Sequence, residues 1–351
     1  MTKRLGISCN ALSLGGGMER YALDLIQELN KRGIRPVVFT KKVDTALIDL
    51  LDIELHVCNC GWCPSKIRDY YYSKWLSTKK RIANIDVLIG CNRNLSSDIA
   101  VCGGTHKGYI TAIRRNRFTD KLVVNLEQKY FKNAQYVVAH SKLMRQELID
   151  YYQVSKERIH VIYPPVNQST FYSKIKEEKA ALREVLGLPK DYTIFLFVSS
   201  SHQRKGLPLL IDYFEKTSLP VKLIVVGRPL RSEYKNIISI GFTKEVQKYY
   251  WASDFTILAS TYEPFGLVGV ESVLCGTPVI LTDNIGCNEV IKNNAKICFI
   301  RNDKNSLEQS ISNSLTFDHN IGYSCITEDL SIQTHVDQLL TLTKKIIEKN
   351  D

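Results

Sequence analysis

Two series of alternating apolar strands and amphipathic helices, separated by a pair of prolines, constrain the fold of this chain more than any other feature. The start, RLGISCNALSLGGGMERYALDLIQELNKRGIRPVVFT, has apolar runs at 5–9 and 36–40. Between them lie a glycine run and a segment whose apolar residues recur at helical spacing. This order predicts a strand, a loop, a helix and a second strand, which together form a βαβ unit with parallel strands.

The same alternation continues through both halves of the chain. Further strands are predicted at 85–90, 98–104, 134–141, 158–166, 192–200, 221–227, 237–242, 254–259, 278–282 and 296–300, and helices at 120–133, 142–152 and about 331–349. No regular element continues through Pro164–Pro165, so the domain boundary is predicted there. The predicted fold class is α/β. Two Rossmann-like, doubly wound parallel-sheet domains, 1–165 and 166–332, are expected to face each other across a cleft, with the last helix, from about 333 to 351, packing back on the first domain.

Composition places the chain among globular proteins. Hydrophobic residues make up 44% and charged residues 24%, which is not typical of a disordered chain. The sequence has no basic start followed by an apolar run and no apolar stretch of ~20 residues, so neither a signal peptide nor a membrane span is predicted. The cytoplasm is the expected compartment. The ten cysteines are interpreted as reduced thiols. The cluster Cys58, Cys60 and Cys63 lacks a second ligand pair, so no metal site is predicted, with a zinc site as the alternative.

Positive charge is concentrated in the first half. Residues 1–160 hold 26 lysines and arginines against 15 acidic residues, whereas residues 161–351 hold 21 of each. Solubility alone does not explain this asymmetry. It indicates an anionic partner for the first half: a membrane surface, an anionic lipid or a nucleic acid.

Two loops at predicted strand ends have the composition of phosphate-binding sites. The run Gly15-Gly16-Gly17 stands between the first strand and the first helix, where backbone amides bind anions, although a plain tight turn is an alternative. In SSSHQRKGLPLLID, Arg204 and Lys205 stand at the start of a helix that follows a strand. Two adjacent cations there suit a diphosphate, with a solvated surface pair as the alternative.

The stretch EPFGLVGVE places two glutamates eight positions apart around a helix start. Glu263 falls in the turn, and Glu271 is expected about two turns inside the helix. A carboxylate accepts two hydrogen bonds from a sugar diol, and the first amides of a helix have no partner in that helix. The pattern predicts a nucleotide sugar along this helix start, with an exposed glutamate pair as the alternative. The base is predicted to pack near Val226, Gly227, Arg228 and Phe242, which do not select among uridine, guanosine and adenosine.

Six segments together resemble the family-4 retaining glycosyltransferases of GT-B fold, and among these the hexosyltransferases that build the lipopolysaccharide core. They are GGGMERY, AHSKLMRQELIDYY, RIHVIYPPV, SSHQRKGLPLLI, VVG and EPFGLVGVESVLCGTPVI, which span nearly the whole chain in the family's order. The resemblance implies an N-terminal acceptor domain and a C-terminal donor domain. It also implies donor phosphates near Gly16, Gly17 and the backbone amides of Phe265, Gly266, Leu267 and Val268, a leaving diphosphate neutralised by Arg204 and Lys205, the transferred sugar at Glu263, and the ribose at Glu271.

His106, in GGTHKGY, resembles the family's histidine near the reacting carbon, with a structural histidine as the alternative. Glu127 is a weaker candidate. Retention at the anomeric carbon is implied by the resemblance. No Asp-x-Asp stands at a strand end, so no metal or other cofactor is predicted. The predicted reaction transfers a hexose from a UDP-glucose-like donor to a membrane-associated glycolipid. Open alternatives are a soluble or protein acceptor, or another GT-B enzyme such as a sugar-nucleotide epimerase or a phosphorylase, and the oligomeric state stays open.

Basic residues mixed with aromatic ones predict peripheral binding to the inner face of the cytoplasmic membrane, near an anionic glycolipid. In PSKIRDYYYSKWLSTKKR and IRRNRFTDK they are Lys66, Arg68, Trp75, Lys79, Lys80, Arg81, Arg114, Arg115 and Arg117. Solvated helix faces are the alternative. A protein that binds nucleic acid would use the same basic surface, but the phosphate loops and the two glutamates would then have no purpose, so no nucleic-acid partner is predicted.

Overall fold

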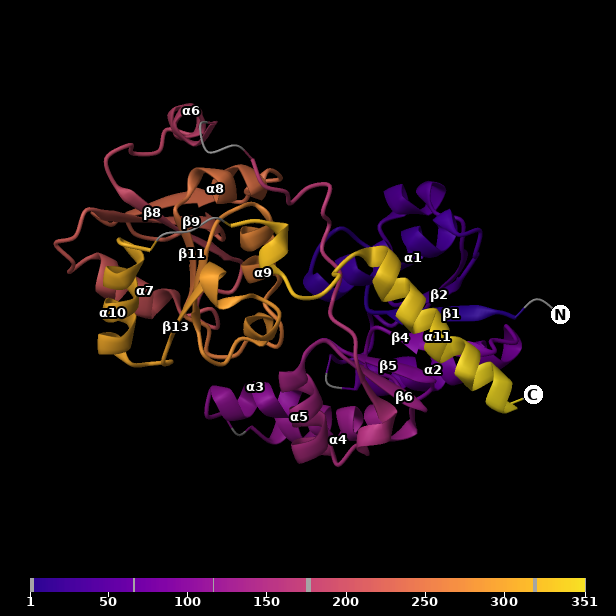
Figure 1. Cartoon of the computed structure of the whole chain (residues 1–351). Helices are drawn as coiled ribbons and strands as arrows, with labels where there is room; N and C mark the ends of the chain where they lie inside the picture. The colour runs from indigo at the N-terminus through magenta and orange to yellow at the C-terminus, as the bar shows by residue number, and fades with distance from the viewer. Residues whose placement is uncertain (1–2, 66, 116, 175–177, 318–320, 351) are drawn as a thin grey trace. The chain divides into compact units, whose positions relative to one another are not determined.

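A computed structural model describes residues 3–65, 67–115, 117–174, 178–317 and 321–350. The chain divides into two compact units (Figure 1). Unit 1 comprises Met1–Pro165 and Leu330–Asp351, and unit 2 comprises Val166–Asp329. Each unit is built on one parallel sheet, so the predicted α/β class with two Rossmann-like sheets is confirmed.

The sheet of unit 1 has seven strands in the order β3-β2-β1-β4-β5-β6-β7. These strands are β1 (Leu5–Cys9), β2 (Val37–Thr40), β3 (Glu54–Val57), β4 (Val87–Gly90), β5 (Ile99–Cys102), β6 (Tyr136–Ala139) and β7 (Ile159–Val161). The α-helices are α1 (Gly17–Lys31), α2 (Arg68–Ile82), α3 (His106–Ala112), α4 (Phe118–Asn133), α5 (Lys142–Tyr152) and α11 (Ile332–Asn350). The strand order reverses between β1 and β4, where sheets of this kind bind ligands beyond the carboxyl ends of their strands.

The sheet of unit 2 has six strands in the order β10-β9-β8-β11-β12-β13. They are β8 (Thr193–Ser199), β9 (Val221–Gly227), β10 (Ile237–Gly241), β11 (Phe255–Leu258), β12 (Val279–Thr282) and β13 (Lys296–Phe299). The α-helices are α6 (Glu178–Val185), α7 (Leu207–Phe214), α8 (Val246–Ala252), α9 (Leu267–Leu274) and α10 (Lys304–Ser314). Here the order reverses between β8 and β11. The loops that follow these two strands, which include Arg204 and Glu263, therefore meet at the switch point of the sheet.

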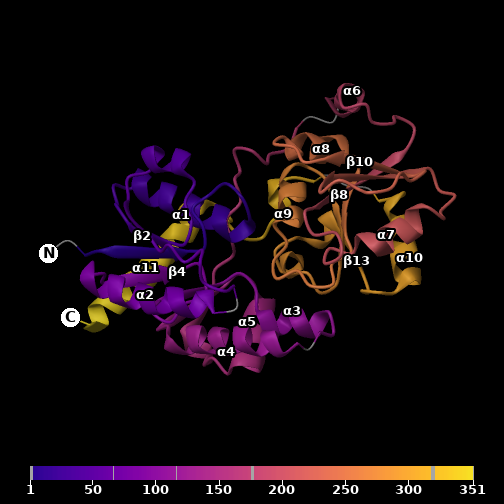
Figure 2. The same cartoon turned by 180° about the vertical axis from the view of Figure 1, so that it is seen from behind.

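The two faces of the sheet in unit 1 bury different helices, because successive side chains of a strand point to opposite faces. Ile7, Val38 and Ile89 share one apolar cluster with residues of α1 and α11. Phe39 and Leu88 belong to a second cluster that includes residues of α2. Helix α2 therefore covers the face opposite to the one covered by α1 and α11 (Figures 1 and 2).

The C-terminal helix α11 packs against α1, at the other end of the sequence (Figure 1). Val336, Leu339 and Ile346 are buried in the cluster that α1 also lines. At the start of α11, the hydroxyl of Tyr21 lies 2.7 Å from Nε2 of His335, and Nδ1 of His335 lies 2.8 Å from the carbonyl oxygen of Tyr163. These contacts tie the last helix to unit 1.

Among the described residues, no helix combines the length and the apolar character that crossing a bilayer requires.

Candidate functional site

Three helices begin with a glycine in the left-handed region after a strand of one of the two sheets. Gly16, Gly206 and Gly266 have φ angles of 69°, 81° and 91° and cap α1, α7 and α9. A side chain at Gly206 would place Cβ 1.9 Å from the carbonyl oxygen of Ala259, so the start of α7 lies directly against the end of β11. Only glycine satisfies both the backbone conformation and this close approach.

Arg204 and Lys205 converge on Glu263, as the sequence predicts for residues at neighbouring strand ends. Nη1 of Arg204 lies 3.1 Å from Oε2 of Glu263 and donates to the carbonyl oxygen of Tyr262 at 2.9 Å. Nζ of Lys205 lies 4.0 Å from the same carboxylate oxygen. Glu263 is only 8% exposed, so one largely buried carboxylate faces two cations. The contact of Lys205 is long, so its ammonium group is available to an anionic ligand.

Glu271 lies one turn inside α9, because that helix begins at Leu267, so the expected depth of two turns is wrong. The hydroxyl of Tyr250, on α8, donates to Oε2 of Glu271 at 2.9 Å. Burial raises the pKa of Glu271, while Tyr250 and the charge of Lys205 act against that rise. Lys205 thus lies within electrostatic reach of both glutamates. We call Arg204, Lys205, Glu263 and Glu271 the unit 2 cluster.

The turn before α9, which contains Phe265, is held in place by the loop after β12. The amide of Gly286 donates to the carbonyl oxygen of Glu263 at 3.2 Å, and that of Cys287 donates to Phe265 at 2.6 Å. A Cβ at Gly286 would lie 2.1 Å from the carbonyl oxygen of Pro264. This bracing fixes the direction of the first amides of α9, those of Leu267 and Val268, at the carboxyl edge of the sheet.

The region predicted to hold a base adjoins this edge. Gly227 has a φ of 120°, and a Cβ there would lie 2.2 Å from the carbonyl oxygen of Ser199. The amide of Arg228 donates to Ser199 at 3.0 Å, and Nε2 of His202 lies 2.7 Å from the carbonyl oxygen of Arg228. Phe242 is 72% exposed and offers a free aromatic face. The contact of these residues with a base stays a prediction.

The sequence did not single out four residues near these sites. Tyr250 and His202 have the contacts described above, and Ser260 and Asn284 lie beside the strand ends of β11 and β12. Within the part of the chain that the structure describes, Oγ of Ser260 and Oδ1 of Asn284 are buried without a hydrogen-bond partner. Such atoms are costly unless a ligand or water satisfies them. Serine and asparagine are common in loops, so nothing in the sequence marked Ser260 and Asn284 as site residues.

In unit 1, His106 opens α3 after β5 and belongs to a network of charged residues. Its Nε2 lies 2.9 Å from Oδ1 of Asp120, and its backbone amide donates to Glu127 at 2.8 and 3.1 Å. Arg93 pairs with Glu127 at 2.7 Å, and Arg115 contacts Asp120 with two guanidinium nitrogens. We call these five residues the α3 cluster. The weaker candidate, Glu127, thus contacts the main chain of His106, whereas Gly16 and Gly17 lie exposed at the start of α1.

Several predicted surface cations have internal partners instead. Lys80 binds Asp98 at 2.6 Å, Arg68 donates to the carbonyl oxygen of Cys63 at 2.9 Å, and Arg115 binds Asp120. Trp75, expected at a membrane surface, is half-buried and packs against the core cluster that contains Phe39, because it flanks the face of α2 that packs on the sheet. Its contact with a membrane stays a prediction. Lys66 lies outside the described residues.

Exposed residues of α2 and its preceding loop form one outer face, at helical spacing. They are Trp62, Ile67, Tyr71, Lys74, Arg81 and Ile82. The ring of Trp62, 71% exposed, packs edge-on against Tyr71 at 5.2 Å, and its indole N–H donates to the carbonyl oxygen of Asn59. We call these six residues the α2 outer face. Lys79 is half-buried on the flank of α2, and Arg114 and Arg117 are exposed between α3 and α4.

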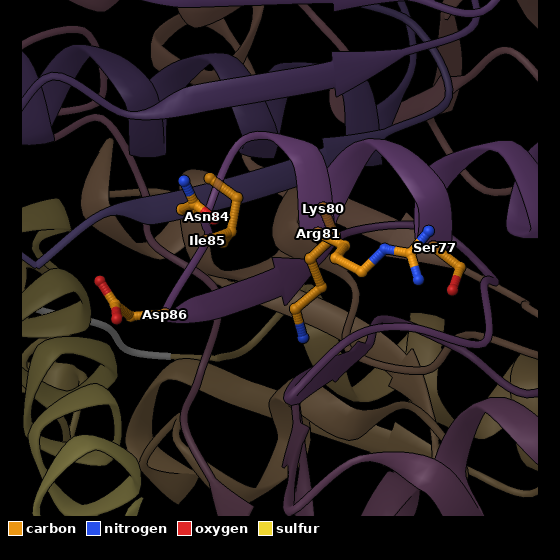
Figure 3. Close-up of a pocket in the computed structure, with 6 residues that line it drawn as sticks. All are labelled: Ser77, Lys80, Arg81, Asn84, Ile85 and Asp86. Carbon is orange, nitrogen blue, oxygen red and sulfur yellow. The ribbon is translucent and has the colours of Figure 1, made fainter. Parts of the chain in front are cut away.

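A pocket of about 420 Å³ lies at the C-terminal end of α2 (Figure 3). Its lining residues are Ser77, Lys80, Arg81, Asn84, Ile85 and Asp86. Figure 3 shows Arg81 and Ser77 side by side on the helix. Because Asp86 lies just before β4, the pocket opens at the amino end of the sheet, away from the strand ends where the predicted ligand loops lie.

The cysteine cluster lies in the core. Cys58, Cys60 and Cys63 are buried with Phe39 and Tyr72. Burial, together with the neighbouring thiol of Cys60, raises the pKa of Cys58 to about 12. Among the described residues, no three His, Cys, Asp or Glu side chains are grouped so that they could hold a metal ion.

Comparison with known proteins gives two family matches. Residues 15–170 match the family described as Glycosyltransferase Family 4, and residues 178–316 match Glycosyl transferases group 1. A Burkholderia thailandensis protein named "probable transglycosylase" is 42% identical over 348 residues, which cover 96% of each chain.

Solved structures share the fold. WaaG, a glycosyltransferase involved in lipopolysaccharide biosynthesis, superposes with a TM-score of 0.76 at 17% identity, covering 98% of each chain. Anabaena Alr3699/HepE in complex with UDP and glucose superposes with a TM-score of 0.69 at 18% identity, covering 99% of each chain. At 17% and 18% sequence identity, these superpositions show only that the fold is shared.

Proposed function

This chain belongs to the glycosyltransferases of family 4 and group 1, with the GT-B fold, and from this membership we propose that it is a retaining, metal-independent hexosyltransferase. Its donor is a nucleotide diphosphate sugar, with a UDP-glucose-like donor favoured. Its acceptor is a membrane-associated glycolipid such as a lipopolysaccharide core. The enzyme acts in the cytoplasm, on the inner face of the membrane.

The unit 2 cluster is the observation that carries this proposal. Arg204 and Lys205 both face the carboxylate of Glu263, at 3.1 and 4.0 Å, and the long contact of Lys205 would leave its ammonium group available to a diphosphate. The braced start of α9 adds backbone amides on the same edge of the sheet. Tyr250 donates a hydrogen bond to Glu271, and the remaining acceptor positions of this carboxylate would bind the ribose hydroxyls.

For glycosyl transfer, stabilising the leaving diphosphate matters more than supplying a nucleophile from the protein. Glycosyl transfer passes through an oxocarbenium-like state while a diphosphate departs with negative charge. Cations and amides fixed in place before the reaction stabilise that charge without a metal ion. Arg204 and Lys205 would supply the cations, and the first turn of α9 would supply the amides.

Two buried orphan atoms extend the proposed donor site toward the sugar. Asn284 immediately precedes Ile285, which pairs with Glu263 in an isolated parallel bridge. Oδ1 of Asn284 and Oγ of Ser260 have no partner among the described residues. Sugar hydroxyls would satisfy both atoms, and Glu263 would accept from a neighbouring hydroxyl. The favoured UDP-glucose-like donor is consistent with the bound UDP and glucose in the HepE structure.

The α2 outer face supports the membrane part of the proposal. It combines four apolar or aromatic side chains with Lys74 and Arg81, and the acid of α2, Asp69, is turned away and pairs with Lys41. The indole N–H of Trp62 is already bonded to Asn59, so its insertion among lipid headgroups would leave no donor unpaired. Such a face suits an anionic bilayer surface.

Ligand-induced stabilisation tests the donor proposal directly. We expect UDP to raise the melting temperature of the full chain more than GDP or ADP does, because a ligand that binds only the folded state stabilises it by mass action. UDP-glucose should then be turned over in the presence of EDTA. If none of the three nucleotides shifts the transition at saturating concentration, the proposed donor site is wrong.

A further inference from the structure

Resting on the proposed function, we propose that Asp120 is a positioning residue that fixes the tautomer of His106. The proton of the neutral imidazole is then on Nε2, and the lone pair of Nδ1 is presented to a hydroxyl group of the substrate. His106 would act there as a hydrogen-bond acceptor. No role for Asp120 was predicted from the sequence.

The main chain at His106 is fixed independently of its ring. Its backbone amide donates to both oxygens of Glu127, at 2.8 and 3.1 Å. Glu127 is buried, and it also accepts from Arg93 at 2.7 Å and from the hydroxyl of Tyr152. At the preceding residue, the hydroxyl of Thr105 caps α3 by accepting from the amide of Gly108 at 3.0 Å. The position from which the imidazole projects is therefore well determined.

The ring itself is oriented by a carboxylate that can only accept. Nε2 of His106 lies 2.9 Å from Oδ1 of Asp120, which is itself buried. Oδ2 of Asp120 accepts from Nε of Arg115 at 3.0 Å and from the amide of Arg117 at 3.1 Å. The hydrogen bonds from Arg115, and then that from His106, lower the pKa of Asp120 below its usual range. An ionised carboxylate has no proton to donate, so Nε2 must supply the one in this bond.

The other ring nitrogen has no competing partner. No other described residue forms a hydrogen bond with the imidazole of His106, and its side chain is 16% exposed. The ring of Tyr109 lies beside it at 6.3 Å between centroids, and the guanidinium of Arg115 lies over that same ring. With Nε2 protonated, the neutral ring presents a bare Nδ1, which accepts a hydrogen bond from a hydroxyl group.

A purely structural ion pair would not need this arrangement. Asp120 already has Arg115 as a counter-charge and the amide of Arg117 as a donor, so its charge is compensated without His106. The imidazole is therefore the member of this group whose proton position Asp120 controls. In serine proteases, where a carboxylate orients a histidine in the same way, replacing that aspartate by asparagine gives the wrong tautomer and a large loss of turnover.

Nitrogen NMR of the full chain, labelled with ¹⁵N-histidine, tests the inference without substrate. At about pH 8, where an ordinary histidine is neutral, long-range ¹H–¹⁵N correlation separates bare from protonated ring nitrogens. The cross-peaks of His106 are assigned by their loss in His106→Asn. We expect protonated Nε2 and bare Nδ1. A protonated Nδ1 in the wild-type chain would overturn the inference, and this measurement needs no folded Asp120 variant.

The variant Asp120→Asn sharpens the test. Its amide group can donate to Nε2 and so favours the opposite tautomer, with the proton on Nδ1, while Asp150→Asn, an exposed site on α5, is the matched control. With UDP-glucose as donor, kcat should fall roughly ten- to thousand-fold with little change in KM, since tautomer control affects the reacting complex more than binding. Either an unchanged tautomer or an unchanged kcat in folded Asp120→Asn would overturn the inference. If the wild-type chain showed no turnover, the proposed function would be contradicted. The NMR spectrum would still show which ring nitrogen of His106 carries the proton.

Discussion

The unit 2 cluster and the α3 cluster lie at the carboxyl edges of two similar sheets, yet their charges are arranged differently. In unit 2, Arg204 and Lys205 share the carboxylate of Glu263 at 3.1 and 4.0 Å. In unit 1, Asp120 and Glu127 each accept several hydrogen bonds, such as those from Arg115 and Arg93. In the first cluster Lys205 makes long contacts, at 4.0 Å to Glu263 and 3.4 Å to the carbonyl oxygen of Val198, whereas the carboxylates of the second cluster are nearly saturated with hydrogen bonds.

This difference separates a binding role from a positioning role. A cation held by a long, shared contact can turn to a ligand at little cost. A buried and fully bonded carboxylate cannot, because breaking its bonds would leave an uncompensated charge. Substitutions in the unit 2 cluster should therefore affect function more than stability. Substitutions of buried polar groups in unit 1 should affect stability or geometry first.

Replacing Lys205 by alanine should have the largest effect and tests the binding half of this comparison. We expect turnover to fall about a hundred- to a thousand-fold, the loss typical when one charge stabiliser of a transition state is removed. The melting temperature should change little, because the contacts of Nζ of Lys205 with described residues are long, at 4.0 Å to Glu263 and 3.4 Å to the carbonyl oxygen of Val198.

Steady-state kinetics measure the turnover of Lys205→Ala, and calorimetry measures its melting temperature. Lys190→Ala is a matched control, since Lys190 pairs with Glu184 on the surface of the same unit at 2.8 Å. Near-normal turnover in Lys205→Ala would remove Lys205 from the proposed site. A large loss of stability would show that the unit 2 cluster is structural.

The same contrast explains how much of the site could be predicted from sequence. Arg204, Lys205 and Glu263 each follow a strand, and parallel strands bring their carboxyl ends to one edge, so their proximity follows from the pattern. Asp120 was not predicted, because it lies inside a helix and reaches His106 only through the packing of α3 on α4. Tyr250 was not predicted for a similar reason, since it donates its hydrogen bond to Glu271 from a separate helix.

The surface was harder to predict than the edges of the sheets. Lys80 resembles any exposed lysine in sequence, but its partner Asp98 lies on the far side of β4 in the chain. The exposure of Trp75 depends on which face of α2 packs on the sheet, and the residues of α2 alone do not fix that face. Strand β3, Glu54–Val57, was not predicted either, because an edge strand with the sequence ELHV has no continuous apolar run.

The next largest effect is expected at the starts of the helices. Gly206→Ala should destabilise unit 2 by about 1–3 kcal/mol, because the residue combines a φ of 81° with a Cβ position 1.9 Å from the carbonyl oxygen of Ala259. Nucleotide affinity should fall as the start of α7 shifts. Gly322→Ala is the control in the same unit, where a Cβ meets nothing within 4 Å. Urea unfolding measures the stability, and UDP titration measures the nucleotide affinity. If the two variants had equal stability and equal affinity, the requirement for glycine at the start of α7 would be contradicted.

Buried histidines should make unit 1 sensitive to acid. Burial lowers the pKa of His140 to about 3, with His335 contributing, and burial lowers that of His335 to about 4. The folded state cannot take up the protons that the unfolded chain binds below about pH 6.5. Stability is therefore complete above that pH and is lost as the pH falls toward the folded values.

The variant His140→Gln isolates one of these contributions. Between pH 7 and pH 5 each histidine should cost about 2 kcal/mol of stability. The free energy of unfolding of the variant should therefore fall by about 2 kcal/mol less than that of the wild-type chain over this pH range. Urea unfolding in a Trp251→Phe background measures it, because the tryptophans that remain, Trp62 and Trp75, lie in unit 1. An unchanged slope would show that His140 binds a proton in the folded state.

The smallest effect is expected on the α2 outer face, where binding and packing can be separated with two tryptophans. Trp62→Ser should lower partitioning onto anionic vesicles roughly five-fold, the effect of losing about 1 kcal/mol from a half-inserted indole, without changing stability. Trp75→Phe, on the packed flank of α2, should bind vesicles normally. Flotation with phosphatidylglycerol vesicles at low and moderate salt measures both. Equal binding of the two variants, or no binding of the wild-type chain at either salt, would contradict a membrane role for this face and favour a soluble acceptor.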